Sequence, residues 1–117
     1  MSKRILLVDD SPLILATAKH ALEEAGFEVA TRSTFDELMT QPIDVYDLIL
    51  MDVQMPELYG DDVAMVLRER GHAMPIYLYS SLDPVDLAER AKAARVDGFI
   101  SKQDVSDMVE RVREILT

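Results

Sequence analysis

Short apolar runs alternate along the chain with longer segments of helical periodicity. Five of the runs have the length of a β-strand and cover residues 5–8, 27–30, 48–51, 76–79 and 96–100. The first and third are continuous aliphatic blocks, which is typical of strands covered on both faces of a parallel sheet. The pattern therefore predicts five strands with helices on both sides of the sheet.

The segments between the strands carry signals that start and stop helices. The residues expected to open the five helices are Ser11 (before Pro12), Thr34, Asp61 or Asp62, Asp83 (before Pro84) and Asp104. The residues expected to stop the first three helices are Gly26, Gln41-Pro42 and Gly71. The chain is thus expected to alternate strand and helix five times.

This alternation predicts an α/β fold of the (βα)5 type. Alternating strands and helices specify a parallel sheet with right-handed crossovers, and five units are too few to close an eight-stranded barrel. We therefore expect an open three-layer sandwich with the flavodoxin-like strand order 2-1-3-4-5. In that order the ligand crevice lies at the carboxyl ends of the first and third strands.

Acidic residues follow the two strands that flank this crevice. Asp9 and Asp10 end the first strand and Asp52 ends the third, so their carboxylates are expected to meet at its mouth. The repulsion among them is relieved by a raised pKa, a nearby lysine or a bound cation. Mg2+ fits best, with Mn2+ as the alternative, because it is commonly held by one or two carboxylates and keeps several waters.

A hydroxyl and an ammonium are expected at the same edge. Ser80 closes the fourth strand and Lys102 follows the fifth. Taken singly, Ser80 reads as a turn residue and Lys102 as a surface lysine, and Asp52 alone reads as a turn former. Asp10 or Ser11 alone reads as a helix cap. Together they fit a phosphoryl-transfer site, in which a carboxylate attacks phosphorus while a metal and an ammonium offset charge on the oxygens.

The composition narrows the classes of function. The 117 residues fit one domain, and a hydrophobic content of 49% supplies one core. The formal charge of −10 would repel phosphates of nucleic acids and anionic lipids, so we expect no direct nucleic-acid binding and no membrane binding. Cysteine is absent, which excludes disulfides and thiolate metal sites. The apolar run at residues 5–8 is too short for a signal peptide or a membrane span, so a cytoplasmic protein is expected.

Four elements of the sequence match one family in order and spacing. They are Leu7-Val8-Asp9-Asp10-Ser11, the segment DVQMPELYG at residues 52–60, Ser80, and Phe99-Ile100-Ser101-Lys102. With these elements the chain resembles the receiver domain of two-component response regulators, of the single-domain, chemotaxis-regulator-like kind. The resemblance covers nearly all 117 residues and implies one receiver domain over residues 1–117.

The resemblance implies the phosphoacceptor and the metal ligands. Asp52 would accept the phosphoryl group. Mg2+ would be bound directly by Asp10, Asp52 and the backbone carbonyl of Gln54, and through water by Asp9. Gly60 is expected to shape the loop after Asp52, because glycine permits a backbone conformation that other residues resist.

The resemblance also implies the parts of a switch. Lys102 would contact the phosphoryl group, Ser80 would donate a hydrogen bond to it, and Phe99 would swing inward as the Ser80 hydroxyl moves. The phosphoryl group adds about −1.5 to −2 charge, and its new bonds would favour a second conformation. The readout would be the surface of the fourth helix, the fifth strand and the fifth helix.

A signalling protein rather than an enzyme is therefore expected. The donor would be a histidine kinase or a histidine phosphotransfer protein, and the chain would catalyse only its own phosphoryl acceptance and dephosphorylation. The altered surface would serve a downstream protein target, a fused output domain or a phosphorylation-dependent homodimer.

Two alternatives stand beside this interpretation. Receiver domains usually have proline, often in a cis bond, after the family's lysine, whereas this chain has Gln103. A cis bond there would cost about 2.5–4 kcal/mol, so a trans bond is expected, and a receiver-like interaction module that acts without phosphorylation stays an alternative. The remote alternative is a phosphohydrolase of the haloacid dehalogenase type, which needs an aspartate where this chain has Gln54.

Overall fold

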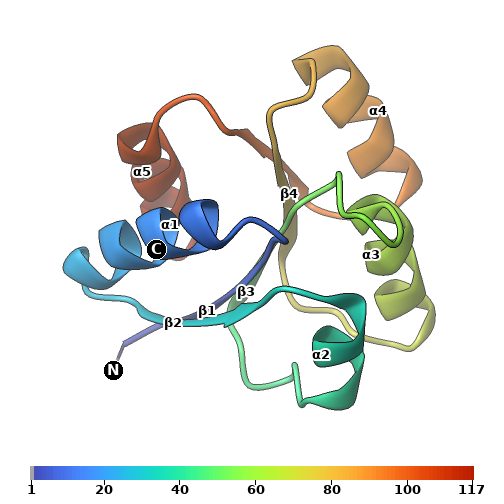
Figure 1. Cartoon of the computed structure of the whole chain (residues 1–117), viewed down its shortest axis with the longest axis horizontal. Helices are drawn as coiled ribbons and strands as arrows, with labels where there is room; N and C mark the ends of the chain where they lie inside the picture. Colours follow the sequence, from blue (N-terminus) through green and yellow to red (C-terminus); the bar gives the residue numbers. More distant parts are fainter. Residues whose placement is uncertain (1) are drawn as a thin grey trace.

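A computed structural model describes residues 2–117, in which five parallel strands form one central sheet (Figure 1). The strands are β1 (Arg4–Val8), β2 (Glu28–Arg32), β3 (Leu48–Met51), β4 (Ile76–Ser80) and β5 (Gly98–Ser101). Their order is β2-β1-β3-β4-β5, which confirms the flavodoxin-like order predicted from the sequence. The register pairs Val8 with Met51, so β1 and β3 end at the same level.

Five helices connect the strands and cover both faces of the sheet. Helices α1 (Pro12–Glu24) and α5 (Val105–Ile115) lie on one face, whereas α2 (Phe35–Thr40), α3 (Gly60–Glu69) and α4 (Pro84–Ala93) lie on the other (Figure 1). The predicted three-layer α/β sandwich is therefore confirmed. Within residues 2–117, no helix combines the length and the apolar character needed to cross a membrane.

The sheet separates two hydrophobic cores. The core under α2, α3 and α4 includes Leu6, Val8, Leu38, Ile49, Met51, Leu67, Leu78 and Leu87. The core under α1 and α5 includes Ile5, Leu7, Ala18, Leu22, Leu48, Leu50, Tyr79, Ile100, Met108 and Val112. Successive residues of β1 and β3 enter opposite cores, which explains why both strands read as unbroken aliphatic runs.

Side-chain caps fix the start of four helices. The side-chain oxygen that accepts a first-turn backbone N–H belongs to Ser11 in α1, Thr34 in α2, Asp83 in α4 and Asp104 in α5. These caps are the ones predicted from the sequence. Helix α3 begins at Gly60 without a side-chain cap, one or two residues before the predicted start at Asp61 or Asp62. Gly26 (φ 98°) and Gly71 (φ 88°) follow α1 and α3 in the left-handed region, as their role as stop signals requires.

Candidate functional site

Three aspartates meet at the carboxyl edge of the sheet. Asp9 and Asp10 follow β1, and Asp52 follows β3. The backbone N–H of Asp52 donates to the carbonyl oxygen of Val8 at 2.8 Å, which joins the ends of the two strands. One oxygen from each of the three carboxylates lies within 4.8 Å of the other two. The structure thus brings together the acidic residues that the sequence assigns to this edge.

Lys102 places a positive charge among these carboxylates. It directly follows β5, and its backbone N–H donates to the carbonyl oxygen of Ser80 at 2.9 Å. Its Nζ atom lies 2.6 Å from Oδ2 of Asp9 and 3.0 Å from Oδ1 of Asp52. The other Asp9 oxygen accepts a hydrogen bond from the backbone N–H of Ser11 at 2.9 Å. Both carboxylate oxygens of Asp9 therefore accept hydrogen bonds, one from the backbone of Ser11 and one from the ammonium of Lys102.

The site is buried on one side and open on the other. Asp9 is 3% exposed and Asp52 is 5% exposed, whereas Asp10 lies on the surface. Burial raises the pKa of Asp52 to about 6 against the opposing ammonium of Lys102, and the charges of Asp9 and Asp10 add to the rise. Burial acts to lower the pKa of Lys102, but its hydrogen bonds to Asp9 and Asp52 outweigh burial and raise it. The ionised form of Asp52 is thus less favourable than that of an exposed aspartate.

The donor set of the site fits a divalent cation. The cluster offers carboxylate oxygens, which are the ligands that Mg2+ prefers. Lys102 neutralises one of the three carboxylates, so two negative charges are left to balance a doubly charged ion. The exposed Asp10 keeps one side open to the waters that Mg2+ retains.

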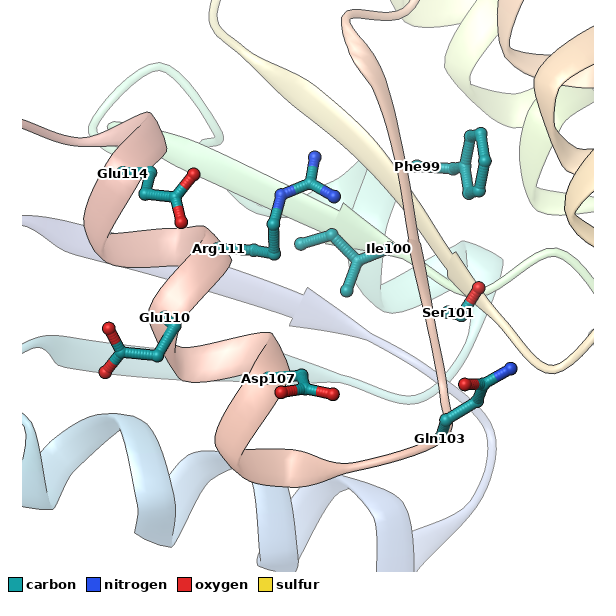
Figure 2. Close-up of a pocket in the computed structure, with 8 residues that line it drawn as sticks. All are labelled: Phe99, Ile100, Ser101, Gln103, Asp107, Glu110, Arg111 and Glu114. Atoms are coloured by element: carbon teal, nitrogen blue, oxygen red, sulfur yellow. The ribbon is translucent and has the colours of Figure 1, made fainter.

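Ser80 and Phe99 lie on neighbouring strands next to Lys102. Ser80 is 1% exposed, and its hydroxyl oxygen accepts a hydrogen bond from the backbone N–H of Leu82 at 3.2 Å, which leaves its proton free to donate elsewhere. Phe99 is half-buried and packs against the core under α2, α3 and α4. Its ring projects from β5 on the side away from α5 (Figure 2).

Tyr79 lies next to the site, and its contact with Lys102 was not predicted from the sequence. Its ring is 6% exposed and lies 5.4 Å from the Nζ atom of Lys102, measured to the ring centroid. Burial raises the pKa of the Tyr79 phenol, and the charge of Lys102 opposes that rise. The aromatic face thus attracts the ammonium that the carboxylates also bind.

The loop after Asp52 is closed by backbone contacts. Gln54 pairs with Tyr59 in an isolated antiparallel bridge, and the N–H of Gly60 donates to the carbonyl oxygen of Val53 at 2.8 Å. A Cβ atom at Gly60 would lie 1.7 Å from the carbonyl oxygen of Asp52. The prediction that Gly60 supplies an unusual backbone conformation is wrong, because Gly60 is helical and glycine is required there for space.

Two features distinguish the β5 side of the site. The described residues contain no cis peptide bond, so the trans bond expected between Lys102 and Gln103 is confirmed.

A groove of about 360 Å³ lies between β5 and α5 (Figure 2). Acidic side chains of α5 line much of it: Asp107, Glu110 and Glu114, with Arg111 among them.

Comparisons with known proteins agree with this fold and site. The family description "response regulator receiver domain" matches residues 5–113. The chain is 32% identical over 117 residues to the transcriptional regulatory protein PrrA of Mycobacterium tuberculosis, with 98% of this chain and 50% of PrrA covered. It is 30% identical over 115 residues to the cell cycle transcriptional regulator CtrA of Caulobacter vibrioides, with 97% and 50% covered. The chain therefore spans about half the length of these relatives.

Solved structures support the same assignment. A CheY-like response regulator receiver domain protein from Methanospirillum hungatei superposes with a TM-score of 0.86 at 26% identity, covering 99% of this chain and 94% of that one. The response regulator TrrA of Thermotoga maritima, solved in complex with Mg2+ and BeF, gives a TM-score of 0.82 at 28% identity, covering 97% and 98%. The strand order, the clustered aspartates and the family match agree, and the chain belongs to the response regulator receiver domains, the signalling switches of two-component systems.

Proposed function

We propose that residues 1–117 form one receiver domain that accepts a phosphoryl group on Asp52 and is activated by it. The observation that supports this most directly is the ammonium of Lys102, which lies 2.6 Å from Asp9 and 3.0 Å from Asp52 at the edge of an acidic cluster. A buried carboxylate beside a fixed cation can attack phosphorus and then carry it as an acyl phosphate.

The chemistry follows from the charges of the site. An ionised oxygen of Asp52 attacks phosphorus, a new O–P bond forms, and the bond from phosphorus to the donor nitrogen breaks with its electron pair on nitrogen. Lys102 offsets charge on a phosphoryl oxygen, while Asp9 keeps the ammonium in position. Mg2+, or Mn2+ in its place, would be held by Asp10, Asp52 and the Gln54 carbonyl, with Asp9 through water, and would supply further positive charge.

Ser80 and Phe99 are the proposed switch. The Ser80 proton is free to bond a phosphoryl oxygen, since the hydroxyl oxygen accepts from Leu82 in the present conformation. Movement of Ser80 would let Phe99 turn inward and so change the surface of α4, β5 and α5. That surface includes the acidic groove between β5 and α5.

The proposed partners are proteins. The phosphoryl donor is a histidine kinase or a histidine phosphotransfer protein, and the receiver of the signal is a downstream protein, a fused output domain or a second copy of the phosphorylated chain. The chain acts on no substrate beyond its own acyl phosphate, which it forms and hydrolyses. The net charge of −10 disfavours direct contact with nucleic acid or anionic lipid, and a cytoplasmic location is proposed with these partners.

The test is phosphorylation by a small donor. Wild-type protein is incubated with Mg2+ and acetyl phosphate, quenched in acid and weighed by intact mass spectrometry, and we expect the mass of one added phosphoryl group. Asp52→Asn should gain none. Asp62→Asn, which alters an exposed aspartate outside the cluster, should be labelled like wild type.

Two outcomes would support other functions. Wild type that binds Mg2+ but gains no phosphoryl group would favour a receiver-like interaction module that acts without phosphorylation, the alternative that Gln103 raises. Steady release of phosphate from a simple phosphate ester would favour the phosphohydrolase alternative. A labelled Asp52→Asn protein would falsify the choice of acceptor.

A further inference from the structure

Arg90 connects helix α4 to the region that follows Asp52. Its Nη1 atom lies 3.3 Å from each carboxylate oxygen of Asp61, in the first turn of α3, and its Nε atom lies 3.2 Å from Asp86 in α4. Its Cζ atom lies 5.2 Å from the centroid of the Tyr59 ring. One side chain of α4 therefore contacts both the end of the loop and the beginning of α3.

Tyr59 is the residue through which Arg90 reaches the loop. Its backbone pairs with Gln54, and its carbonyl oxygen accepts from the N–H of Val63 at 3.2 Å. Its side chain is on the surface, with 52% of the residue exposed. Because half of the residue is exposed, the guanidinium over the ring is one of the restraints on the position of the ring.

The loop borders the open side of the acidic cluster. Residues 54–59 and Asp10 line one hollow of about 460 Å³. A displacement of the loop would therefore change what faces Asp10. Gln54 is exposed, so its place depends on the bridge to Tyr59 rather than on burial.

We propose that Arg90 is a positioning residue for the metal site, which holds the loop at residues 54–59 from helix α4 so that the Gln54 carbonyl keeps its place in the hollow that Asp10 also lines. The inference rests on the proposed function, which assigns that carbonyl to Mg2+. Arg90 acts through Tyr59 and Asp61 and touches neither the metal nor the phosphoryl group. Because the contact joins α4 to the loop, metal binding and the position of α4 influence each other by the same factor.

Charge alone predicts the opposite effect of removing Arg90. A guanidinium near an acidic site disfavours a cation, and its loss would also free the carboxylates of Asp61 and Asp86. If Arg90 acted only through its charge, Mg2+ would bind more tightly to Arg90→Ala than to wild type. If Arg90 positions the loop, Mg2+ binds more weakly. The sign of the change therefore separates the two roles.

The experiment is a Mg2+ titration of the full chain by isothermal calorimetry, with unfolding in urea and EDTA as the second readout. Arg90→Ala is expected to weaken Mg2+ binding about fivefold, the effect of losing one exposed cation–π contact and its ion pair. Tyr59→Leu should weaken it similarly, and Arg90→Lys should restore part of the loss. Lys92→Ala removes the same charge from an exposed position of α4, and its affinity should stay at or slightly above that of wild type.

Each outcome decides one question. Mg2+ affinity in Arg90→Ala that equals or exceeds that of wild type overturns the inference, as does an equal loss in Lys92→Ala. Absence of Mg2+ binding by wild type overturns the proposed function instead. If Arg90→Ala is unfolded in EDTA, Arg90→Lys and Tyr59→Leu decide: unchanged affinity in both overturns the inference, and weakened affinity in both supports it.

Discussion

The ammonium of Lys102 lies 2.6 Å from Oδ2 of Asp9, although 93 positions separate the two residues in the sequence. Lys102 follows the edge strand β5 and Asp9 follows β1, with β3 and β4 between them in the sheet. Asp52, at the end of β3, binds the same ammonium at 3.0 Å. The ammonium of Lys102 thus links the ends of β1, β3 and β5 at the carboxyl edge of the sheet.

Lys102→Ala should make the metal-free protein less stable. Two buried carboxylates lose their counter-ion, so we expect the free energy of unfolding at pH 7 to fall by about 2 kcal/mol in urea with EDTA. Millimolar Mg2+ should restore part of the loss. Lys19→Ala breaks an exposed pair with Glu23 and should change stability by less than about 0.5 kcal/mol, so equal losses would contradict the prediction.

The raised pKa of Asp52 gives the protein a specific dependence on pH. The pKa is about 6 in the folded chain against an ordinary value of 3.8, so the folded state binds the proton more tightly. The contribution of Asp52 to the free energy of unfolding of the metal-free protein therefore decreases as pH rises through this window, by up to about 3 kcal/mol. Asp52→Asn removes this titration, so it should gain stability relative to wild type as pH rises from about 4 to about 7.

Urea unfolding in EDTA at several pH values measures this difference. The absolute stability of Asp52→Asn also contains the altered bond to Lys102, so the slope with pH is the informative quantity. A difference between the two proteins that stays constant across the window would contradict the raised pKa.

Asp10→Ala should separate metal binding from stability. Asp10 is exposed and forms no ion pair within residues 2–117, so its removal should change metal-free stability by less than about 0.5 kcal/mol. As a proposed direct ligand, its loss should weaken Mg2+ binding at least about tenfold, measured by calorimetry. The exposed Asp62→Ala is the control and should bind Mg2+ like wild type. Equal affinities of Asp10→Ala and wild type would exclude Asp10 as a ligand.

The ring of Tyr79 should affect the rate of phosphorylation through Lys102. Tyr79→Phe keeps the aromatic face and should react with acetyl phosphate within about twofold of wild type, while Tyr79→Leu loses the face and should react about twofold to fivefold more slowly. The time course of intact mass measures both rates. Equal rates for the two variants would show that the aromatic face has no part in positioning the ammonium.

Gly60→Ala should displace the backbone of Asp52 or of the start of α3 through a steric clash. The added Cβ atom would lie 1.7 Å from the carbonyl oxygen of Asp52 and 2.8 Å from its carbonyl carbon, both of them backbone atoms. We expect a loss of at least about 2 kcal/mol in the free energy of unfolding and weaker Mg2+ binding, because Asp52 or the start of α3 must move. A variant as stable as wild type would mean that the helix start shifts without cost.

The centre of the sheet was predictable because β1 and β3 are nearly unbroken aliphatic runs, whereas the bounds of the edge strands β2 and β5 were less predictable. The second strand was predicted over residues 27–30, whereas β2 continues to Arg32. Thr31 and Arg32 are polar, but β2 is a half-buried edge strand, where polar residues are tolerated. Strand β5 begins at Gly98 rather than at residue 96. Asp97 lies in a bend before β5, and its carboxylate accepts a hydrogen bond from the N–H of Ile76 at 2.9 Å. Hydrophobic periodicity does not reveal such a contact between distant segments.

The members of the site were predictable from topology, but their pairing was not. The rule that parallel strands end at one edge predicted the meeting of Asp9, Asp10 and Asp52 with Lys102. Which of the adjacent Asp9 and Asp10 turns inward depends on the path of the chain after β1, and the structure buries Asp9. The contact of Tyr79 with Lys102 depends on side-chain directions across two strands, which the sequence does not contain. The assigned roles in phosphorylation and metal binding stay predictions.

The rings of Tyr79 and Phe99 lie in the cores on opposite faces of the sheet. Tyr79 belongs to the core under α1 and α5, whereas Phe99 packs against the core under α2, α3 and α4. A change of charge at the carboxyl edge can therefore alter the packing on both faces of the sheet. Two partner proteins that bind on opposite faces could then both respond to that change without competing for one surface.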